Sequence, residues 1–356
     1  MHDLKTLGWN AHFDKEFEPY RNEGYRTGRV ALEYQGLYRI FTESGEMLAE
    51  VTGRMRFQAG GREDFPAVGD WVVIAPLENQ KKALIHAILP RTSKFSRKAA
   101  GQGADEQVVA TNVDVIFLVQ GLDKDYNLRR IERYLALALE SGAHPVIILN
   151  KADLADDLEA RVREVESISQ GLPVHAISAK REEGLEALKQ YLGQGVTAAF
   201  LGSSGVGKST LINRLLGRER QKVSEVRQSD DRGRHTTRHR ELIVLPEGGL
   251  LIDTPGMREL QLLDVDEGLA DTFADIETIA RDCYFSNCRH EREPDCAVKA
   301  AIEEGILDPA RLENYKKMQS EIEYLESRND FKTRMERKER ERKFGKLAKE
   351  IKKRKR

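Results

Sequence analysis

One stretch of the sequence, Gly202–Ser209, limits what this chain can fold into more than any other. It reads Gly-Ser-Ser-Gly-Val-Gly-Lys-Ser and matches the pattern G-x-x-x-x-G-K-[ST] of a phosphate-binding loop. The apolar run Val196–Leu201 before it predicts a short buried strand, and Thr210–Leu216 after it has helical apolar spacing. In that setting backbone N–H groups and a helix N-terminus surround phosphate oxygens. The sequence therefore predicts a nucleotide-binding α/β domain rather than a glycine-rich turn.

The loop also predicts roles for single residues. The Lys208 ammonium is expected to reach the β- and γ-phosphates as a catalytic group, and the Ser209 hydroxyl is expected to bind Mg²⁺. The residues expected to contact the nucleotide here are Gly202, Ser203, Ser204, Gly205, Val206, Gly207, Lys208, Ser209 and Thr210.

A second motif, Asn-Lys-Ala-Asp at 150–153, matches the N-K-x-D pattern that reads guanine. The Asp153 carboxylate can accept from both N1–H and the 2-amino group of guanine, and adenine offers no such pair of donors. Asn150 is expected to hold the base edge and fix the loop, and the Lys151 stem to lie along the ring. The S-A-K loop, Ser178, Ala179 and Lys180, is expected to support the base through backbone N–H groups.

A third motif, Asp253-Thr254-Pro255-Gly256, follows another predicted strand. Asp253 is expected to hold Mg²⁺ through water, and the Gly256 N–H to bond the γ-phosphate. Each short motif is weak alone, but all of them fall at strand ends, where ligands bind in parallel sheets. Together they predict a GTP/GDP and Mg²⁺ site. A P-loop kinase or ATPase is disfavoured by Asn150–Asp153, and an RNA-binding module with a structural nucleotide site stays open.

The motifs stand in an unusual order, because the guanine-reading loops precede the phosphate loop. In Ras-like GTPases the phosphate loop comes first. The termini of compact domains often lie close together, so a permuted chain can build the same sheet. The fold class expected is therefore α/β, a circularly permuted Ras-like P-loop GTPase domain.

The remainder of the 356-residue chain divides by composition. Five short β segments with turns between them predict a small closed barrel of the OB type, either RNA-binding or merely structural. These segments are Arg29–Tyr34, Leu37–Thr42, Met47–Thr52, Asp70–Ala75 and Ala83–Leu89. The domains expected are an irregular N-terminal arm (1–25), the barrel (26–92), a flexible basic linker (93–110), the GTPase domain (111–268), a zinc-binding helical domain (269–327) and a basic tail (328–356).

All three cysteines of the chain cluster with one histidine: Cys283, Cys288, His290 and Cys296. Three thiolates and one imidazole are the ligand set of a closed tetrahedral zinc site. Since no position stays open for water, one Zn²⁺ with a fold-holding role is expected.

A barrel, permuted GTPase motifs and a C-x4-C-x-H-x5-C cluster, in that order, resemble the RsgA (YjeQ) family of small-ribosomal-subunit biogenesis GTPases. The resemblance covers about residues 25 to 326. It implies a GTPase that binds the small ribosomal subunit and its rRNA late in assembly and is strongly stimulated by that subunit. The N-terminal arm and the basic tail carry no motif that the resemblance explains.

The segment Arg232–Arg238 resembles switch I, in which a threonine completes the Mg²⁺ shell. Thr237 fits the T-R pattern of related GTPases better than Thr236. Met257 stands where Ras-like enzymes carry a water-orienting glutamine, so slow intrinsic hydrolysis is expected. His235 or the ribosome could supply the missing catalytic group, and the sequence does not choose between them.

Charge and hydropathy complete the expectations. Residues 328–356 hold 15 Lys/Arg against 5 Asp/Glu, a local charge of +10 in a chain of net charge −1. Such a tail is expected either to contact RNA phosphates or to act only as a solvated tail. No apolar run approaches a membrane span, and the N-terminus has no signal-peptide pattern. A cytoplasmic, monomeric protein without membrane contact is expected.

Overall fold

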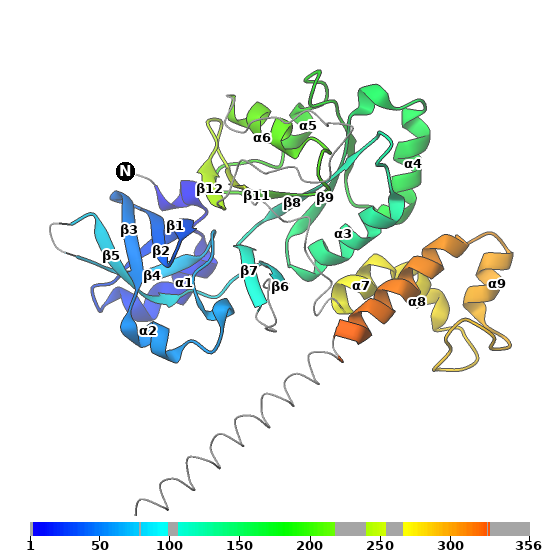
Figure 1. Cartoon of the computed structure of the whole chain (residues 1–356), viewed down its shortest axis with the longest axis horizontal. Helices are drawn as coiled ribbons and strands as arrows, with labels where there is room; N and C mark the ends of the chain where they lie inside the picture. The colour runs from blue at the N-terminus through cyan, green and yellow to red at the C-terminus, as the bar shows by residue number, and fades with distance from the viewer. Residues whose placement is uncertain are drawn as a thin grey trace, which may run out of the picture.

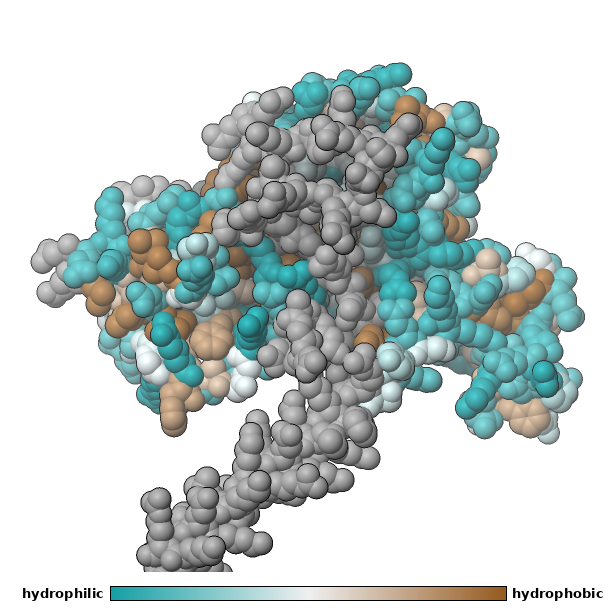
Figure 2. All heavy atoms as spheres, in the orientation of Figure 1, coloured by the Kyte–Doolittle hydropathy of each residue, from teal (hydrophilic) through white to brown (hydrophobic). Residues whose placement is uncertain are grey.

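The computed structural model describes residues 3–77, 80–98, 106–217, 240–253, 266–325 and 327. Figure 1 shows a small barrel at the left, a sheet with helices in the centre and a group of helices at the lower right. On the face seen in Figure 2, hydrophilic residues cover much of the surface, with scattered apolar residues over the barrel.

The barrel consists of five strands: β1 (Arg26–Tyr34), β2 (Leu37–Thr42), β3 (Gly45–Val51), β4 (Trp71–Pro76) and β5 (Lys82–Ile88). They pair in the order β1-β2-β3-β5-β4, and β4 pairs again with β1 to close the barrel. Alternate apolar residues fill the interior, and Val30, Ile40 and Val72 are fully buried there. The short helices α2 (Gly53–Gln58) and η2 (Arg62–Asp64) join β3 to β4. The five-stranded barrel expected from the sequence is confirmed.

The irregular arm expected for residues 1–25 is wrong for the residues described. They form η1 (Leu4–Leu7) and α1 (Ala11–Arg21). The Asn10 side chain caps α1 by accepting from the N–H groups of His12 and Phe13. Phe13 and Phe17 are buried, and the Trp9 ring lies edge-on to that of Trp71, with centroids 4.8 Å apart. The scattered aromatic residues of this segment are therefore one apolar face packed on the barrel.

A buried arginine of the barrel joins three parts of the chain. The Arg29 guanidinium donates to the carbonyls of Leu7, Gly69 and Asn112. Burial lowers its pKa to about 10, so it stays charged at neutral pH. The N-terminal helices, the barrel and the segment that enters the central sheet are thereby held together.

The flexible linker expected for residues 93–110 is also wrong where it is described. β6 (Lys94–Lys98) and β7 (Glu106–Thr111) form an antiparallel ladder. Phe95, Val109 and Ala110 are buried, which gives this ladder an apolar face that the basic composition of the segment conceals. Residues 99–105 lie outside the described part.

The central sheet has the strand order β10-β9-β8-β11-β13-β12. All neighbours are parallel except β12, which is antiparallel to β13 and pairs with β1 of the barrel through Leu32 and Glu241. Every residue of β8 is buried, as expected for a strand covered on both faces. The strands are β8 (Val115–Gly121), β9 (His144–Asn150), β10 (Val174–Ala176), β11 (Thr197–Leu201), β12 (Glu241–Val244) and β13 (Leu250–Asp253).

Helical segments follow the strands of this sheet along the chain. They are α3 (Leu128–Glu140), η3 (Ala152–Leu154), α4 (Leu158–Ser169), α5 (Glu186–Lys189) and α6 (Lys208–Leu216). The C-terminal region adds α7 (Asp266–Thr272), α8 (Ala274–Ala280), α9 (Ala297–Glu303) and a helix over residues 309–325. Among the residues that the structure describes, no helix has the length and apolarity needed to cross a membrane.

Candidate functional site

The motifs singled out in the sequence lie at one edge of the central sheet. The strands that carry them, β9, β8, β11 and β13, are neighbours in this order, and each pairs in parallel with the next. Asn150 ends β9, Gly202 follows β11, and Asp253 ends β13. Because the carboxyl ends of parallel strands meet at one edge, these residues come from separate parts of the chain to the same place.

Close packing explains the glycines of the phosphate loop. A Cβ on Gly202 would lie 2.3 Å from the Val119 carbonyl oxygen, and one on Gly207 would lie 2.2 Å from the Asn150 amide nitrogen. Gly207 also has a φ of +100°, which side chains rarely adopt. The Lys208 ammonium lies across its own loop, 2.6 Å from the carbonyl oxygens of both Gly202 and Ser203. α6 begins at Lys208, so its free N–H groups point into the loop.

Asn150 joins the phosphate loop to the S-A-K loop. Its side-chain nitrogen donates to the Val206 carbonyl oxygen at 2.7 Å, and its side-chain oxygen accepts from the Ala179 N–H at 3.0 Å. The residue is 2% exposed. Its amide therefore fixes the two loops relative to each other, the loop-holding part of the role expected for it.

Asp153 is held by Ser178. The Ser178 hydroxyl donates to the Asp153 carboxylate at 2.6 Å and accepts from the Arg181 N–H at 3.2 Å. This hydrogen bond is the main cause that lowers the pKa of Asp153. The carboxylate is thus ionised at neutral pH and fixed in orientation. Sequence reasoning assigned Ser178 only a backbone role and missed its hydroxyl.

Three charged residues near the phosphate loop were not predicted. Asp125 accepts from the Ser203 hydroxyl at 2.7 Å and pairs with Arg130 at 2.6 Å, and Arg130 also donates to Ser203. Asp123 pairs with Lys151 of the guanine-reading motif. Both carboxylates follow β8, whose carboxyl end lies at the same sheet edge, and this position is the one signal that could have found them.

The proposed switch residues Thr236, Thr237 and His235 lie outside the described residues, as do Gly256 and Met257. Ser204 and Gly205 lie in the phosphate loop, Ser209 and Thr210 in the first turn of α6, and Lys180 in the S-A-K loop.

The cysteine cluster converges in space. The potential ligand atoms of Cys283, Cys288, His290 and Cys296 all lie within 4.8 Å of one another. The Cys283 sulfur is 3.9 Å from that of Cys296 and 3.6 Å from the His290 Nδ1. Zn–S bonds of about 2.3 Å in a tetrahedron separate sulfurs by roughly 3.8 Å. The four side chains therefore fit one zinc ion with a closed shell.

Comparison with known proteins agrees with this geometry. A family model described as RsgA GTPase matches residues 88–263. The small ribosomal subunit biogenesis GTPase RsgA of Opitutus terrae is 48% identical over 337 residues, which cover 92% of each chain. The chain belongs to the RsgA GTPase family. The RsgA of Methanosarcina acetivorans is 41% identical and covers 97% of this chain and 92% of its own.

Solved structures give the same result for the fold. The crystal structure of YjeQ from Thermotoga maritima matches with a TM-score of 0.63 and 31% identity, over 83% of this chain and 97% of that one. The crystal structure of YloQ, a circularly permuted GTPase, matches with a TM-score of 0.61 and 27% identity, over 85% and 97%. The expected family, the permuted fold and the assignment as a GTP hydrolase are confirmed.

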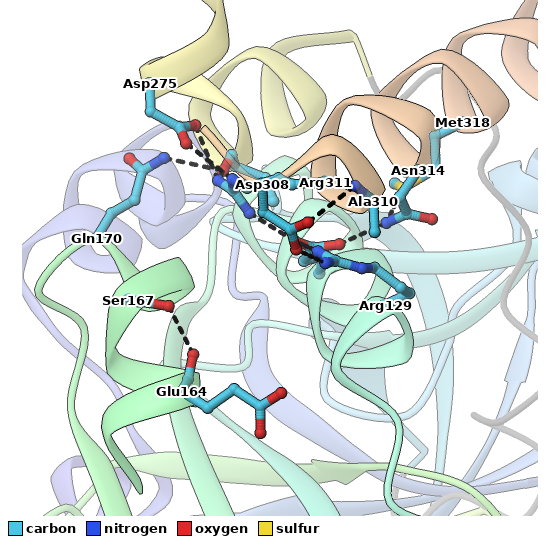
Figure 3. A network of polar contacts seen from close by, with 12 residues as sticks. Arg129, Glu164, Ser167, Gln170, Asp275, Asp308, Ala310, Arg311, Asn314 and Met318 are labelled. Atoms are coloured by element: carbon cyan, nitrogen blue, oxygen red, sulfur yellow. Dashed lines mark hydrogen bonds and ion pairs between the residues drawn. The ribbon is translucent and has the colours of Figure 1, made fainter. Parts of the chain in front are cut away.

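In this RsgA chain, α3 contacts both the phosphate loop and the C-terminal helices. Figure 3 shows Arg129 of α3 beside Asp308, and Arg311 beside Asp275. Arg130, near its start, contacts Ser203 of the phosphate loop. Glu132, fully buried on the same helix, accepts from Arg311 at 2.6 Å, and Arg311 also pairs with Asp275 of α8 at 2.8 Å. Burial raises the pKa of Glu132, against the opposing effect of the nearby arginines. A buried ion network thus lies between the GTPase sheet and the helices that carry the cysteine cluster.

Proposed function

We propose that this RsgA GTPase binds the small ribosomal subunit, acts late in its maturation and hydrolyses GTP to GDP and phosphate at a rate that the subunit stimulates. The observation that supports a GTP site is the Asn150 amide, which joins the phosphate loop to the S-A-K loop beside Asp153. The relatives supply the process, since they are named small ribosomal subunit biogenesis GTPases.

Guanine selection is assigned to Asp153. Its carboxylate is oriented by Ser178 and ionised, so it can accept from N1–H and the 2-amino group of guanine. With adenine the carboxylate would be left without donors, at a cost in binding free energy. The remaining base contacts are assigned to Asn150, Lys151, Ala179 and Lys180.

The phosphates and Mg²⁺ are assigned to the loop Gly202–Thr210 and to Asp253. Lys208 is the cation that would neutralise the β- and γ-phosphates, and Ser209, Asp253 and Thr237 would hold Mg²⁺. Hydroxyl and carboxylate oxygens are the ligands that this ion prefers. When bound, Mg²⁺ neutralises charge on the phosphates. Gly256 as γ-phosphate sensor and His235 as a catalytic group complete the proposal, with Thr236 as the alternative to Thr237.

The cysteine cluster is assigned a structural Zn²⁺ held by Cys283, Cys288, His290 and Cys296. Three thiolates and an imidazole leave no position for a reacting water. The Lys316 ammonium donates to the His290 carbonyl oxygen at 3.0 Å, so the ligand loop is attached to the helix over residues 309–325. The role of the ion would be to hold this loop against that helix.

The chain is proposed to be cytoplasmic and monomeric when free, with barrel, GTPase, zinc and tail regions divided as the sequence predicts. Its partners would be the small subunit and rRNA, with the basic tail at 328–356 adding contacts to phosphates.

The test is co-sedimentation of the full chain with purified small or large ribosomal subunits, in GDP and in a non-hydrolysable GTP analogue. We expect binding to the small subunit, stronger with the analogue. Equal binding to both subunits, or none to the small one, would contradict the proposed partner.

A further inference from the structure

The connection between β8 and α3, residues 122–127, carries a carboxylate that belongs to no nucleotide-binding motif, Asp125. One of its oxygens, Oδ2, accepts from the Ser203 hydroxyl at 2.7 Å. Ser203 is the second residue of the phosphate loop, and the pattern G-x-x-x-x-G-K-[ST] leaves that position free. The contact is therefore an addition to the phosphate-loop pattern rather than a part of it.

Arg130 completes a closed set of contacts around Ser203. Its Nη1 donates to Asp125 Oδ2 at 2.6 Å and to Ser203 Oγ at 3.1 Å. The Ser203 hydroxyl thus donates to one charged group and accepts from another, which fixes its orientation. Burial opposes the ionisation of Asp125, but the hydrogen bonds from Arg130 and Ser203 outweigh it and lower the pKa of this carboxyl. Asp125 is therefore charged at neutral pH, and hydrogen bonds to a charged group are stronger than neutral ones.

The backbone that carries Asp125 is attached to the central sheet and to α3. Gln120, at the end of β8, is 1% exposed, and its Nε2 donates to the Asp125 carbonyl oxygen at 2.9 Å. The Asp125 N–H donates to the Asp123 carboxylate at 3.1 Å. Asn127 caps α3 by accepting from the Arg130 N–H at 3.1 Å. Asp125 and Arg130 are thus held by rigid elements, independently of the phosphate loop that they contact.

Ser203 connects this support to the cation of the phosphate loop. The Ser203 carbonyl oxygen accepts from the Lys208 ammonium at 2.6 Å, and Lys208 is the group proposed to neutralise the β- and γ-phosphates. An ion pair as exposed as that of Asp125 and Arg130 contributes little to the stability of a fold. A small displacement of a group that acts on the reacting atoms can, however, cost a large factor in rate. The contacts of Ser203 are therefore expected to matter for the geometry of the phosphate loop.

We propose that Asp125, together with Arg130, is a positioning residue for GTP hydrolysis. It holds the Ser203 side of the phosphate loop in place and thereby sets where Lys208 meets the phosphates. Asp125 acts on the reaction only through Ser203. The inference rests on the proposed role of Lys208 and adds to it the residues outside the motif on which that role depends.

The test measures kcat and KM for GTP with the full chain alone. The variants are Asp125→Asn, which keeps the size of the side chain and removes its charge, Ser203→Ala, which the phosphate-loop pattern permits, and the double variant. The matched control is Lys124→Gln. Lys124 is exposed and next to Asp125 in the same connection, and its side chain makes no hydrogen bond or ion pair with a described residue.

We expect each single variant to lower kcat about tenfold, the effect of losing one charge-assisted hydrogen bond, and to change KM less, because the base contacts remain. The double variant should be no slower than Ser203→Ala, since two residues that act through one contact are not additive. Lys124→Gln should turn over GTP like the unmodified chain. Asp125 is about half exposed, with 46% of its side chain accessible, so thermal unfolding of its variant should be unchanged.

Three results would each overturn the positioning role of Asp125. They are a kcat for Asp125→Asn equal to that of the control, losses that multiply in the double variant, and a loss of thermal stability large enough to account for the loss of rate. Lys208→Ala, measured alongside, tests the phosphate loop itself. If that variant alone loses turnover, the proposed nucleotide site stands and the role of Asp125 falls; if it retains turnover, the proposed site fails as well.

Discussion

Asp153 shows how a single residue depends on a neighbour that the sequence motif does not emphasise. The N-K-x-D pattern identifies the carboxylate, because the donor pattern of guanine demands an acceptor at that place. The hydroxyl that orients it belongs to Ser178, in another loop. Such a contact depends on how two strand ends meet in the folded chain, so it cannot be predicted from the local sequence.

Replacing Asp153 by asparagine should weaken GTP binding and shift preference toward xanthine nucleotides. The amide presents a donor where guanine needs an acceptor, and xanthine offers a carbonyl oxygen in place of the 2-amino group. Competition between GTP and XTP for the full chain measures the effect. Retained guanine selectivity would refute the assignment of Asp153.

Ser178→Ala should weaken GTP binding about tenfold at neutral pH, because the charged acceptor loses its orienting hydrogen bond. The hydrogen bond lowers the pKa of Asp153, so its loss should raise that pKa toward the ordinary value. Binding requires the ionised form. The variant should therefore lose affinity at a higher pH than the unmodified chain when both are acidified. Affinity titrations between pH 7 and about pH 4 test this, since ordinary Asp titrates near 3.9. Superimposable pH profiles would mean that Ser178 does not act on Asp153.

At the scale of the element, helix α3 makes contacts with two different parts of the molecule. Its first turn contacts the phosphate loop through Arg130, and its buried middle holds Arg311 of the C-terminal helices through Glu132. Arg311 is 4% exposed and Glu132 is fully buried. Removing Arg311 takes away one of the two arginines that pair with the buried Glu132 carboxylate and leaves it with Arg129.

Arg311→Met should destabilise the chain by about 3–5 kcal/mol. Burial already raises the pKa of Glu132, and loss of Arg311 should raise it further. Protonation of Glu132 in the folded variant removes its buried charge. The destabilisation of the variant relative to the unmodified chain should therefore be largest above the raised pKa of Glu132 and should shrink as the pH falls through that pKa. Denaturant unfolding at several pH values measures this.

The double variant Arg311→Met, Glu132→Leu is the control, because removing both charges restores much of the stability. If the double variant is no more stable than the single one, the pair does not carry the effect.

Helices and strands with a regular apolar pattern could be predicted from the sequence. Elements whose apolar face is recognisable only from what they pack against could not. β8 and β9 read as continuous apolar runs, and the barrel strands alternate between turns. Helix α1 is short, and its mean composition is polar, so only its docking on Trp71 reveals the face formed by Phe13 and Phe17. The basic residues of the β6–β7 ladder led in the same way to the prediction of a flexible linker, although the ladder has a buried apolar face. Asp123 and Asp125 belong to no motif, and only their position after β8 connects them to the site.

At the scale of the whole molecule, the cysteine cluster and α3 are joined through the helix over residues 309–325, which provides both Lys316 and Arg311. If the proposed zinc ion is bound there, its release is expected to alter the contact between this helix and α3.

Cys296→Ser should reduce the zinc content of the chain to near zero. A structural site contributes on the order of 10 kcal/mol to local folding, so the ligand loop and α9, which begins directly after Cys296, should lose protection from hydrogen exchange. Ser286→Ala, an exposed non-ligand in the same loop, is the control. Elemental analysis measures the zinc content, and hydrogen exchange measures the protection of the ligand loop and α9. One zinc per chain in the cysteine variant would remove the assigned role.

The central claim is tested most directly by GTP turnover of the full chain, measured alone, with small ribosomal subunits and with large ones. We expect slow turnover alone, a large increase with small subunits and none with large ones, and Lys208→Ala should abolish turnover in all three. Equal rates in the absence and presence of small subunits, or stimulation by large subunits instead, would contradict the account.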